Sequence, residues 1–321
     1  MKKKFITLTQ PLLKRLGLHL VREKEYERLL ETQALLTALI NQAHLPSNNA
    51  LSEGISFVIF SKDRPLQLDG LLRSIQYHVK GVAAIHVLYR ASDAAYECAY
   101  QELAKELQLD TPIHWMPESD FKADLIRTLG KVGTESLCFL VDDIIFIRPV
   151  DLAAIDKDAI RNGIVSLRLG QNINFCYTKQ KPMQVPTLQT PTSSPLLQFS
   201  WKESTYDWAY PLSVDGHIFP TSEIQVAAEQ LNYRAPNTFE RALQILTPLY
   251  QDRPGYCFEA PRMLNIPLNR VQDEVENISG EIDPIYLLDK WNQELTLDFK
   301  ILEAIETNSV HQETQISFTL R

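Results

Sequence analysis

The chain has 321 residues, of which 45% are hydrophobic, 22% charged and 9% aromatic, and its formal net charge is −8. This composition is typical of a folded globular protein and excludes disordered, collagen-like and disulfide-scaffold classes. Residues 1–22 carry six basic side chains and no acidic one, which leaves 26 basic and 40 acidic side chains for the rest. Because nucleic-acid binding requires a basic face, we expect no nucleic-acid partner for this acidic body.

Two segments come before the alternating strands and helices that begin at residue 55, and each predicts an association. Residues 1–22 mix leucines with basic side chains, which suits an interfacial helix attracted to anionic lipid. A packed N-terminal arm is the alternative. Residues 22–43 are strong helix formers with leucines at helical spacing, which predicts an amphipathic helix that could join two copies in a homo-oligomer.

Membrane-spanning and secretion signals are not found in the sequence. No apolar stretch reaches the roughly 20 residues that a spanning helix needs, and no apolar signal-peptide core follows the first lysines. The four cysteines (Cys98, Cys138, Cys176 and Cys257) form no C-x-x-C pair and stand among apolar neighbours. We expect buried, reduced thiols and a cytoplasmic protein, peripheral at the inner face of the membrane if residues 1–22 bind lipid.

From residue 55 onward, strands and helices alternate. The hydrophobic pattern predicts strands at 55–60, 84–89, 112–116 and 137–141. It predicts helices at 65–79, 93–108 and 120–132, the last capped by Ser119. Strands separated by helices of this length form right-handed βαβ units in a mainly parallel sheet. Ligands of such sheets bind beyond the carboxyl ends of the strands.

After residue 149 the pattern changes. A helix at 151–161 and a strand at 164–169 are followed by a long irregular stretch, 170–210, and then by helices at 222–231 and 237–246. Structureless stretches of this length are binding loops or disordered segments. Aromatic side chains favour a binding loop that would help to shape a site: Trp201, Tyr206, Trp208 and Tyr210.

The main chemical feature is Val141-Asp142-Asp143, where two adjacent carboxylates end an apolar strand. Two like charges buried side by side are costly unless a cation or several hydrogen-bond donors neutralise them. A divalent ion held by one or two carboxylates and by phosphate oxygens is one solution. An Asp pair that only caps or turns the chain is the alternative.

Charged side chains also follow the first two strands, in Ser61-Lys62-Asp63-Arg64-Pro65 and in Arg90-Ala-Ser-Asp93. Carboxylates at such strand ends can accept from a base or ribose hydroxyl, while Arg and Lys can pair with a diphosphate. The next helix could add three charged side chains to the same cleft. The candidate nucleotide-binding residues are therefore Ser61, Asp63, Arg64, Lys122, Asp124, Arg127 and Asp142, with solvated charges or helix caps as the alternative.

Two of these segments resemble a known family. Residues 57–75, beginning Phe57-Val-Ile-Phe-Ser-Lys-Asp-Arg-Pro65, look like the first strand and helix of GT-A-type glycosyltransferases. Phe139-Leu-Val-Asp-Asp-Ile-Ile-Phe146 is similar to the DxD region of that family, including its family-2-like and exostosin-like groups. The resemblance covers about 55–280. It implies a GT-A-like α/β sandwich for nucleotide-diphospho-sugar transfer, with a mostly parallel central sheet and here an N-terminal helical extension.

The resemblance also implies a cofactor and partners. Mn²⁺ or Mg²⁺ would be held by Asp143, with Asp142 toward the sugar or ribose, although Val141 stands where the first Asp of a D-x-D would be. The donor would be a nucleotide-diphosphate sugar and the acceptor a glycan or lipid-linked molecule, in surface polysaccharide synthesis. His217 could add a third metal ligand, because imidazole suits these ions; a hydrogen-bonded core histidine is the alternative.

An inverting transferase also needs a carboxylate base for the acceptor hydroxyl. Asn237-Thr-Phe-Glu240 resembles a later x-E-D position of the family, and Asp215 lies before the turn-forming Gly216, so Glu240 and Asp215 are the candidates. Arg270 could lie on a late loop that closes over the diphosphate. A retaining enzyme would need neither carboxylate as base.

These features divide the chain into three parts. A basic segment and helix occupy 1–50, a catalytic domain 55–285, and an acidic segment 286–321; the domain divides into a nucleotide half at 55–150 and an acceptor half at 151–285. A non-catalytic GT-A-like binding or assembly subunit remains an alternative, because the D-x-D is incomplete. A sugar-phosphate nucleotidyltransferase is less favoured, because 61–65 lacks the glycines of a phosphate loop.

Overall fold

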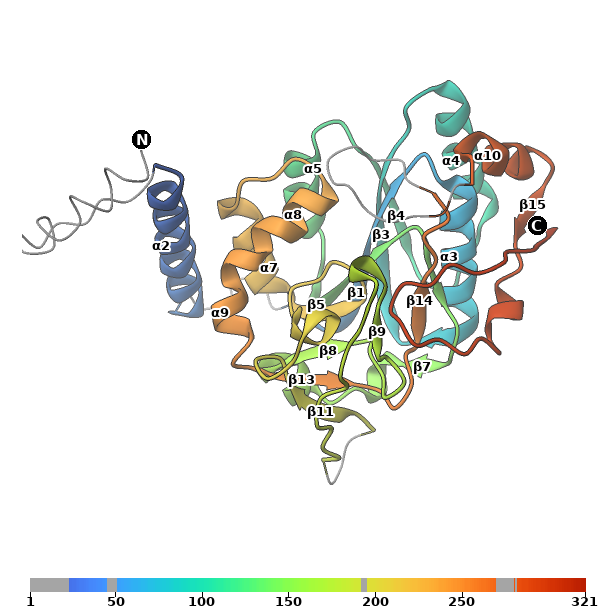
Figure 1. The fold of residues 1–321 in the computed structure, drawn as a ribbon. Coiled ribbons are helices and arrows are strands. Elements are labelled where there is room, and N and C mark those ends of the chain that lie inside the picture. The colour runs from blue at the N-terminus through green and yellow to red at the C-terminus, as the bar shows by residue number, and fades with distance from the viewer. Residues whose placement is uncertain (1–22, 45–50, 192–194, 270–279, 281) are drawn as a thin grey trace, which may run out of the picture. The chain divides into compact units, whose positions relative to one another are not determined.

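The computed structural model describes residues 23–44, 51–191, 195–269, 280 and 282–321 (Figure 1). The chain divides into two compact units, Met1–Pro46 and Ser47–Arg321. The described part of the first unit is the helix α2 (Glu23–His44), which confirms the predicted helix at 22–43. The predicted lipid-binding residues 1–22 lie outside the described residues.

The second unit is built on an eight-stranded sheet in the order β11-β13-β8-β12-β5-β1-β3-β4. These strands are β1 (Ser52–Lys62), β3 (Val82–Arg90), β4 (Ile113–Pro117), β5 (Thr134–Val141), β8 (Ile164–Ser166), β11 (Leu197–Ser200), β12 (His217–Pro220) and β13 (Pro254–Cys257). Parallel pairs join β5, β1, β3 and β4 and also β8 with β13. β12 is antiparallel to both of its neighbours, and β11 is antiparallel to β13. The predicted mostly parallel α/β sheet is confirmed.

The central strand β1 is buried on both faces, which explains its continuous apolar run. Because successive side chains of a strand point to opposite faces, Phe57 and Ile59 share one face and join the main hydrophobic core. Phe60 points to the other face, where its ring packs 5.4 Å from that of Phe121. Each face of the sheet is thus covered by its own set of helices.

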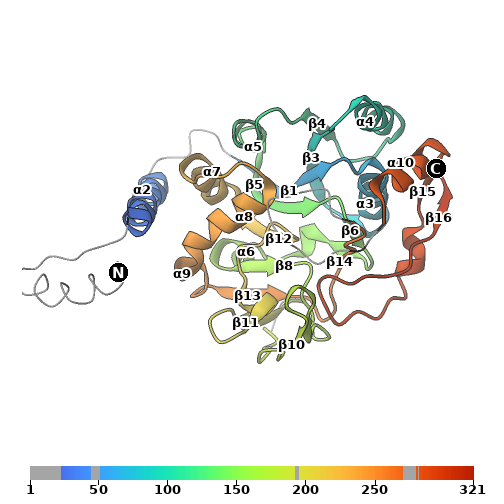
Figure 2. The same ribbon diagram turned by 45° about the horizontal axis from the view of Figure 1, so that its top comes forward.

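Helices on the two faces are distinguishable in Figure 2. α3 (Pro65–His78), α4 (Ala94–Glu106) and α10 (Pro284–Asn292) pack against one another, as do α5 (Phe121–Leu129) and α7 (Thr221–Gln230). The other helical segments are α6 (Lys157–Asn162), α8 (Pro236–Leu243), α9 (Thr247–Tyr250), η1 (Leu152–Ala154), η2 (Tyr177–Lys179), η3 (Tyr206–Ala209), η4 (Gln244–Leu246) and η5 (Phe299–Leu302). Small two-stranded sheets use β2 (Val79–Lys80), β6 (Ile144–Phe146), β7 (Val150–Asp151), β9 (Phe175–Cys176), β10 (Lys181–Pro182), β14 (Met263–Asn265), β15 (Leu295–Leu297) and β16 (Phe318–Leu320).

Local side-chain chemistry determines where the helices begin. Asp93 caps α4 by accepting from the backbone N–H groups of Ala95 and Tyr96. For α5 the expected Ser119 cap is wrong by one residue: Asp120 is the cap and accepts from Ala123 N. The helix predicted over 151–161 is instead interrupted, with η1 and α6 on either side of Ile155 and Asp156.

The acidic C-terminal segment is not a separate part. α10 packs against α3 and α4, and its Trp291 side chain is fully buried. β15 pairs with β16 close to the C-terminus, so the segment 286–321 is integrated into the second compact unit. Among the described helices, none has the length and apolar character required to cross a membrane.

In the described part of the irregular stretch 170–210, short strands and buried aromatic rings hold the chain in place. Trp201 and Trp208 are core residues, so they cannot line a site as expected; Tyr206 and Tyr210 do line a cavity. All four cysteines are free. Three of them are buried as predicted, whereas Cys98 is exposed on α4.

Candidate active site

A cavity of about 530 Å³ opens beyond the carboxyl ends of β1, β3 and β5. These three strands end at Lys62, Arg90 and Val141, and all three residues line the cavity. Further walls come from Arg168 just after β8, the 170–210 stretch, the first turns of α8 and the C-terminal segment. The site predicted at this edge of the sheet is therefore present as a volume large enough for a nucleotide.

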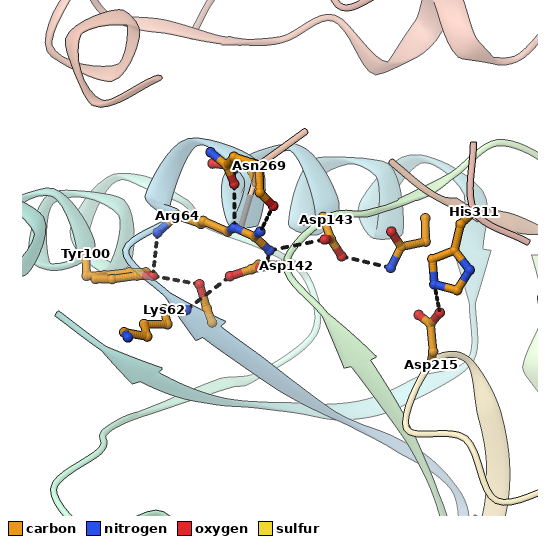
Figure 3. Close-up of polar contacts among 11 residues, drawn as sticks. Lys62, Arg64, Tyr100, Asp142, Asp143, Asp215, Asn269 and His311 are labelled. Atoms are coloured by element: carbon orange, nitrogen blue, oxygen red, sulfur yellow. Dashed lines mark hydrogen bonds and ion pairs between the residues drawn. The ribbon is translucent and has the colours of Figure 1, made fainter. Parts of the chain in front are cut away.

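The two acids that follow β5 meet one arginine from the β1–α3 turn (Figure 3). Arg64 Nη1 lies 2.8 Å from Asp142 Oδ1 and 3.1 Å from Asp143 Oδ2. The backbone N–H of Lys62 donates to the other oxygen of Asp142 at 3.1 Å. Asn265 Nδ2 donates to the other oxygen of Asp143 at 2.9 Å. Every oxygen of the acid pair is thus already an acceptor.

Arg64 is itself firmly held. Its Nε donates to Asn269 Oδ1 at 2.9 Å, and its Nη2 donates to the backbone carbonyl of the same residue. Its backbone N–H donates to the Tyr100 hydroxyl at 3.0 Å, and that hydroxyl is 2.7 Å from Ser61 Oγ. A guanidinium with this many partners is a fixed positive charge at the carboxyl end of β1.

Burial acts against the charge of Asp143. Desolvation raises the pKa of this carboxyl to about 6, helped by the neighbouring Asp142 charge and opposed by Arg64. One arginine therefore does not fully compensate two buried carboxylates, which is the electrostatic cost expected of adjacent acids.

The predicted metal set does not come together. His217 is fully buried in the core, with its Nδ1 2.9 Å from the Pro211 carbonyl and its ring 5.5 Å from Trp201. Burial lowers its pKa to about 3, so it is a neutral core histidine, and it does not line the cavity. No group of three His, Cys, Asp or Glu side chains in the described ranges could hold a metal ion. A third ligand from His217 is thus wrong, and the acid pair as arranged does not fit an ion.

A second charged cluster lines the same cavity. Asp215 Oδ2 lies 3.1 Å from Arg168 Nη1 and 3.3 Å from His311 Nε2. Burial alone would raise the pKa of Asp215, but its contacts with His311 and Arg168 outweigh burial and lower it to about 2. Gly216, at φ +80°, turns the chain directly after this carboxylate. Asp215 is therefore ionised, with Arg168 and His311 both in contact with its Oδ2.

Glu240, the other candidate base, also lines the cavity from α8. Its Oε1 accepts from Ser213 Oγ at 2.8 Å and from the backbone N–H of Val214 at 3.1 Å. Burial raises the pKa of this carboxyl, while the Arg168 charge and these bonds act in the other direction. A carboxyl with a raised pKa is better suited to take up a proton than Asp215 is.

The candidates on α5 do not reach the cavity. Asp124 accepts from the backbone N–H groups of Ser119 and Asp120, so it anchors the start of its own helix. Arg127 pairs with Asp124 at 2.6 Å, and Lys122 donates to the Leu231 carbonyl. None of the three lines the cavity, because local capping takes up their polar groups.

The candidates after β1 divide into two groups. Ser61, Arg64 and Asp142 all line the cavity, and the last two form an ion pair there. Asp63 instead accepts from Ser92 N at 2.7 Å and from its hydroxyl, linking the ends of β1 and β3 without lining the cavity. Arg270 lies outside the described residues.

Sequence reasoning missed Arg168 and His311. Arg168 is a single charge within the apolar run Val165-Ser-Leu-Arg-Leu169, a signal that could have identified it. No local signal marks His311, whose chain segment reaches the site through a parallel bridge with Asn265, the last residue of β14.

Comparison with known proteins gives one sequence relative. It is a bifunctional glycosyltransferase, pgtA, from Dictyostelium discoideum, 25% identical over 281 residues. The chain is similar to a glycosyltransferase. The match covers 76% of this chain but 34% of the relative, so the chain spans about a third of that protein's length. The resemblance found in the sequence is supported by this relative, whereas no family model matches.

Solved structures give weaker likenesses. Staphylococcus aureus TarS aligns with TM-score 0.40 and 12% identity over 64% of this chain and 36% of that one. A TarS fragment, 1–349 in complex with UDP, gives 0.39 and 13% over 64% and 58% of the two chains. A 4-diphosphocytidyl-2C-methyl-D-erythritol synthase from Anaerococcus prevotii gives 0.37 and 13% over 75% and 96%. At these scores the likenesses define neither the activity nor the ligands of this chain.

Proposed function

We propose that this chain is a glycosyltransferase that moves a sugar from a nucleotide-diphosphate donor to a glycan or lipid-linked acceptor, in surface polysaccharide synthesis. The observation that carries the proposal is the acid pair Asp142–Asp143 at the end of β5, which faces a cavity of about 530 Å³. The similarity to a glycosyltransferase supports the same class of chemistry.

Cationic side chains suit the donor's diphosphate. Lys62, Arg90 and Arg234 line the cavity together with Arg64, and two of them come from the carboxyl ends of β1 and β3. Ligands of parallel sheets bind at these ends. Positive charge there stabilises the leaving nucleoside diphosphate as the bond between its phosphate oxygen and the anomeric carbon breaks.

Glu240 is the proposed base. In the transfer, the acceptor hydroxyl oxygen forms the new bond to the anomeric carbon, and its proton passes to the Glu240 carboxylate. Both described hydrogen bonds of this side chain end on Oε1, which leaves Oε2 outside them. The raised pKa of Glu240 brings it closer to the operating pH, where general bases are most effective.

The experiment that tests the proposal is a binding panel followed by a transfer assay. UDP, GDP and CDP are titrated into the full chain by calorimetry, with and without Mn²⁺, and the matching sugar donors are then tested for turnover. We expect one nucleoside diphosphate to bind and its sugar donor to be consumed. If none of the nucleoside diphosphates binds, a non-catalytic assembly subunit is favoured. If the chain releases pyrophosphate from a nucleoside triphosphate in the presence of a sugar phosphate, a nucleotidyltransferase is favoured.

Membrane contact through residues 1–22 and self-association through α2 stay predictions. In α2, Tyr26, Leu29 and Leu30 are exposed large apolar side chains, which is compatible with a helix that packs against a second copy. Sedimentation of the full chain with anionic vesicles, and its mass in solution, test the two predictions separately.

A further inference from the structure

Arg64 occupies the position that the sequence assigned to a divalent ion. Its Nη1 bridges Asp142 and Asp143 at 2.8 and 3.1 Å, and the remaining carboxylate oxygens accept from Lys62 N and Asn265 Nδ2. A hard divalent cation needs about six oxygen ligands in open positions. This donor set offers none that is not already bonded.

The arginine is not a surface side chain that an incoming ion could easily displace. Its side chain is only 10% exposed, and Asn269 holds Nε and Nη2 while Tyr100 holds the backbone N–H (Figure 3). To admit an ion between the acids, the guanidinium would have to leave these partners and remain buried without them. Removing a buried charge from its hydrogen-bonded partners is strongly unfavourable.

The charge of the whole cavity leads to the same conclusion. Six acidic side chains line it: Glu118, Asp142, Asp143, Asp207, Asp215 and Glu240. Six Lys or Arg side chains line it as well: Lys62, Arg64, Arg90, Arg168, Lys179 and Arg234. The lining is thus formally balanced without a metal ion, whereas a site made for a divalent cation carries an excess of acids.

We propose that the chain binds the nucleoside diphosphate of its donor without a divalent ion, with Arg64 as the fixed cation that lies between Asp142 and Asp143 in place of the ion. This inference rests on the proposed function. Four of the five N–H groups of the guanidinium are used by the acids and Asn269, and one on Nη2 remains for an oxygen of the donor. The cations Lys62, Arg90 and Arg234, which also line the cavity, complete the diphosphate site.

The test separates metal binding from nucleotide binding. Mn²⁺ alone is titrated into the full chain and followed by electron paramagnetic resonance, and UDP, GDP and CDP are titrated by calorimetry in EDTA and in Mn²⁺. We expect no saturable Mn²⁺ binding, and an affinity for the preferred nucleotide that changes by less than about twofold between EDTA and Mn²⁺. Arg64→Met should create a saturable Mn²⁺ site that the added change Asp143→Asn removes.

Two results would overturn the inference: saturable Mn²⁺ binding to the unchanged chain that Asp143→Asn abolishes, or a loss of nucleotide affinity of about tenfold or more in EDTA. Neither result uses the Arg64→Met variant, so both can be obtained even if that variant does not fold. If no nucleotide binds under either condition, the proposed function fails, while the Mn²⁺ titration still decides how the acid pair is neutralised. Arg127→Ala is the matched control, because this exposed arginine pairs with an Asp outside the cavity.

Discussion

His311 Nε2 lies 3.3 Å from Asp215 Oδ2, which joins the C-terminal segment to the turn before β12 at the cavity wall. Arg168 contacts the same carboxylate oxygen at 3.1 Å. The carboxylate is therefore shared by a permanent cation and a titratable one. Asp215 and His311 therefore contribute to stability with opposite dependences on pH.

The first prediction concerns pH and stability. The contact with Asp215 raises the pKa of His311 although burial opposes it, so the folded state binds this proton more tightly than the unfolded state does. The stabilisation is complete below the unfolded value of about 6.5 and is lost as the pH rises through the higher folded value. His311→Asn should therefore cost more stability at about pH 6 than at about pH 9, measured by urea unfolding at both pH values.

Asp215 gives the opposite dependence. Its folded pKa of about 2 lies below the ordinary value, so its contribution is present above the unfolded pKa and disappears as the pH falls toward 2. Gln108→Asn, at an exposed position without a titratable group, should keep the unchanged chain's pH profile. Equal losses for His311→Asn at both pH values would show that the histidine is neutral in the folded state.

Several features of the site could be predicted from sequence because they are local. The apolar run 137–141 and the acids after it predict a buried strand with charges at its end, and the structure has both. The pairing of Arg64 with those acids could not be predicted, because it depends on the register that places the end of β1 beside the end of β5. His311 was missed for the same reason, since its position depends on a bridge to Asn265.

The charged residues of α5 show a different limit. Sequence places Lys122, Asp124 and Arg127 on a helix after a strand, where they could face a ligand. The first turn of a helix leaves backbone N–H groups without partners, and the carboxylate of Asp124 satisfies two of them. The same residue types thus serve the helix instead of the cavity.

The second prediction follows from this capping role. Arg127→Ala should cost at most about 1 kcal/mol of unfolding free energy, because its side chain is more than half exposed. Asp124→Ala should cost about 1–3 kcal/mol, because the buried Asp124 carboxylate accepts from Ser119 N, Asp120 N and Arg127, and these bonds are lost together. Neither change should alter nucleotide affinity by more than about twofold. A tenfold loss of nucleotide affinity in Arg127→Ala, with stability unchanged, would mean that Arg127 does contribute to the ligand site.

The third prediction concerns the proposed base. Glu240→Gln keeps the shape and the contact with Ser213 but removes the carboxylate that would accept the proton. The turnover rate should fall by about 10²-fold or more. Affinity for the nucleoside diphosphate should remain, since the proposed diphosphate cations Lys62 and Arg90 come from β1 and β3. Single-turnover rates and calorimetry give the two readings.

Glu229→Gln is the control for that experiment, because Glu229 is an exposed acid near the end of α7 and does not line the cavity. Unchanged turnover in Glu240→Gln would exclude this carboxyl as the base. A comparable loss in Asp215→Asn alone would shift the role to Asp215, despite its low pKa.

The last prediction concerns Gly216, which forms the turn that places Asp215 in the wall of the cavity. Its φ of +80° is unfavourable for any residue with a Cβ, and an added Cβ would lie 2.5 Å from Met263 Sδ. Gly216→Ala should therefore destabilise the protein by about 1–3 kcal/mol, measured by urea unfolding. Met263→Ala in the same chain would relieve the contact but not the backbone strain, so part of the loss should persist in Gly216→Ala/Met263→Ala relative to Met263→Ala alone.

Gly133→Ala, where an added Cβ meets nothing within 4 Å, should leave stability nearly unchanged. Equal stabilities for the Gly216 and Gly133 variants would mean that the turn before β12 relaxes freely, and Asp215 would then not be held rigidly between Arg168 and His311.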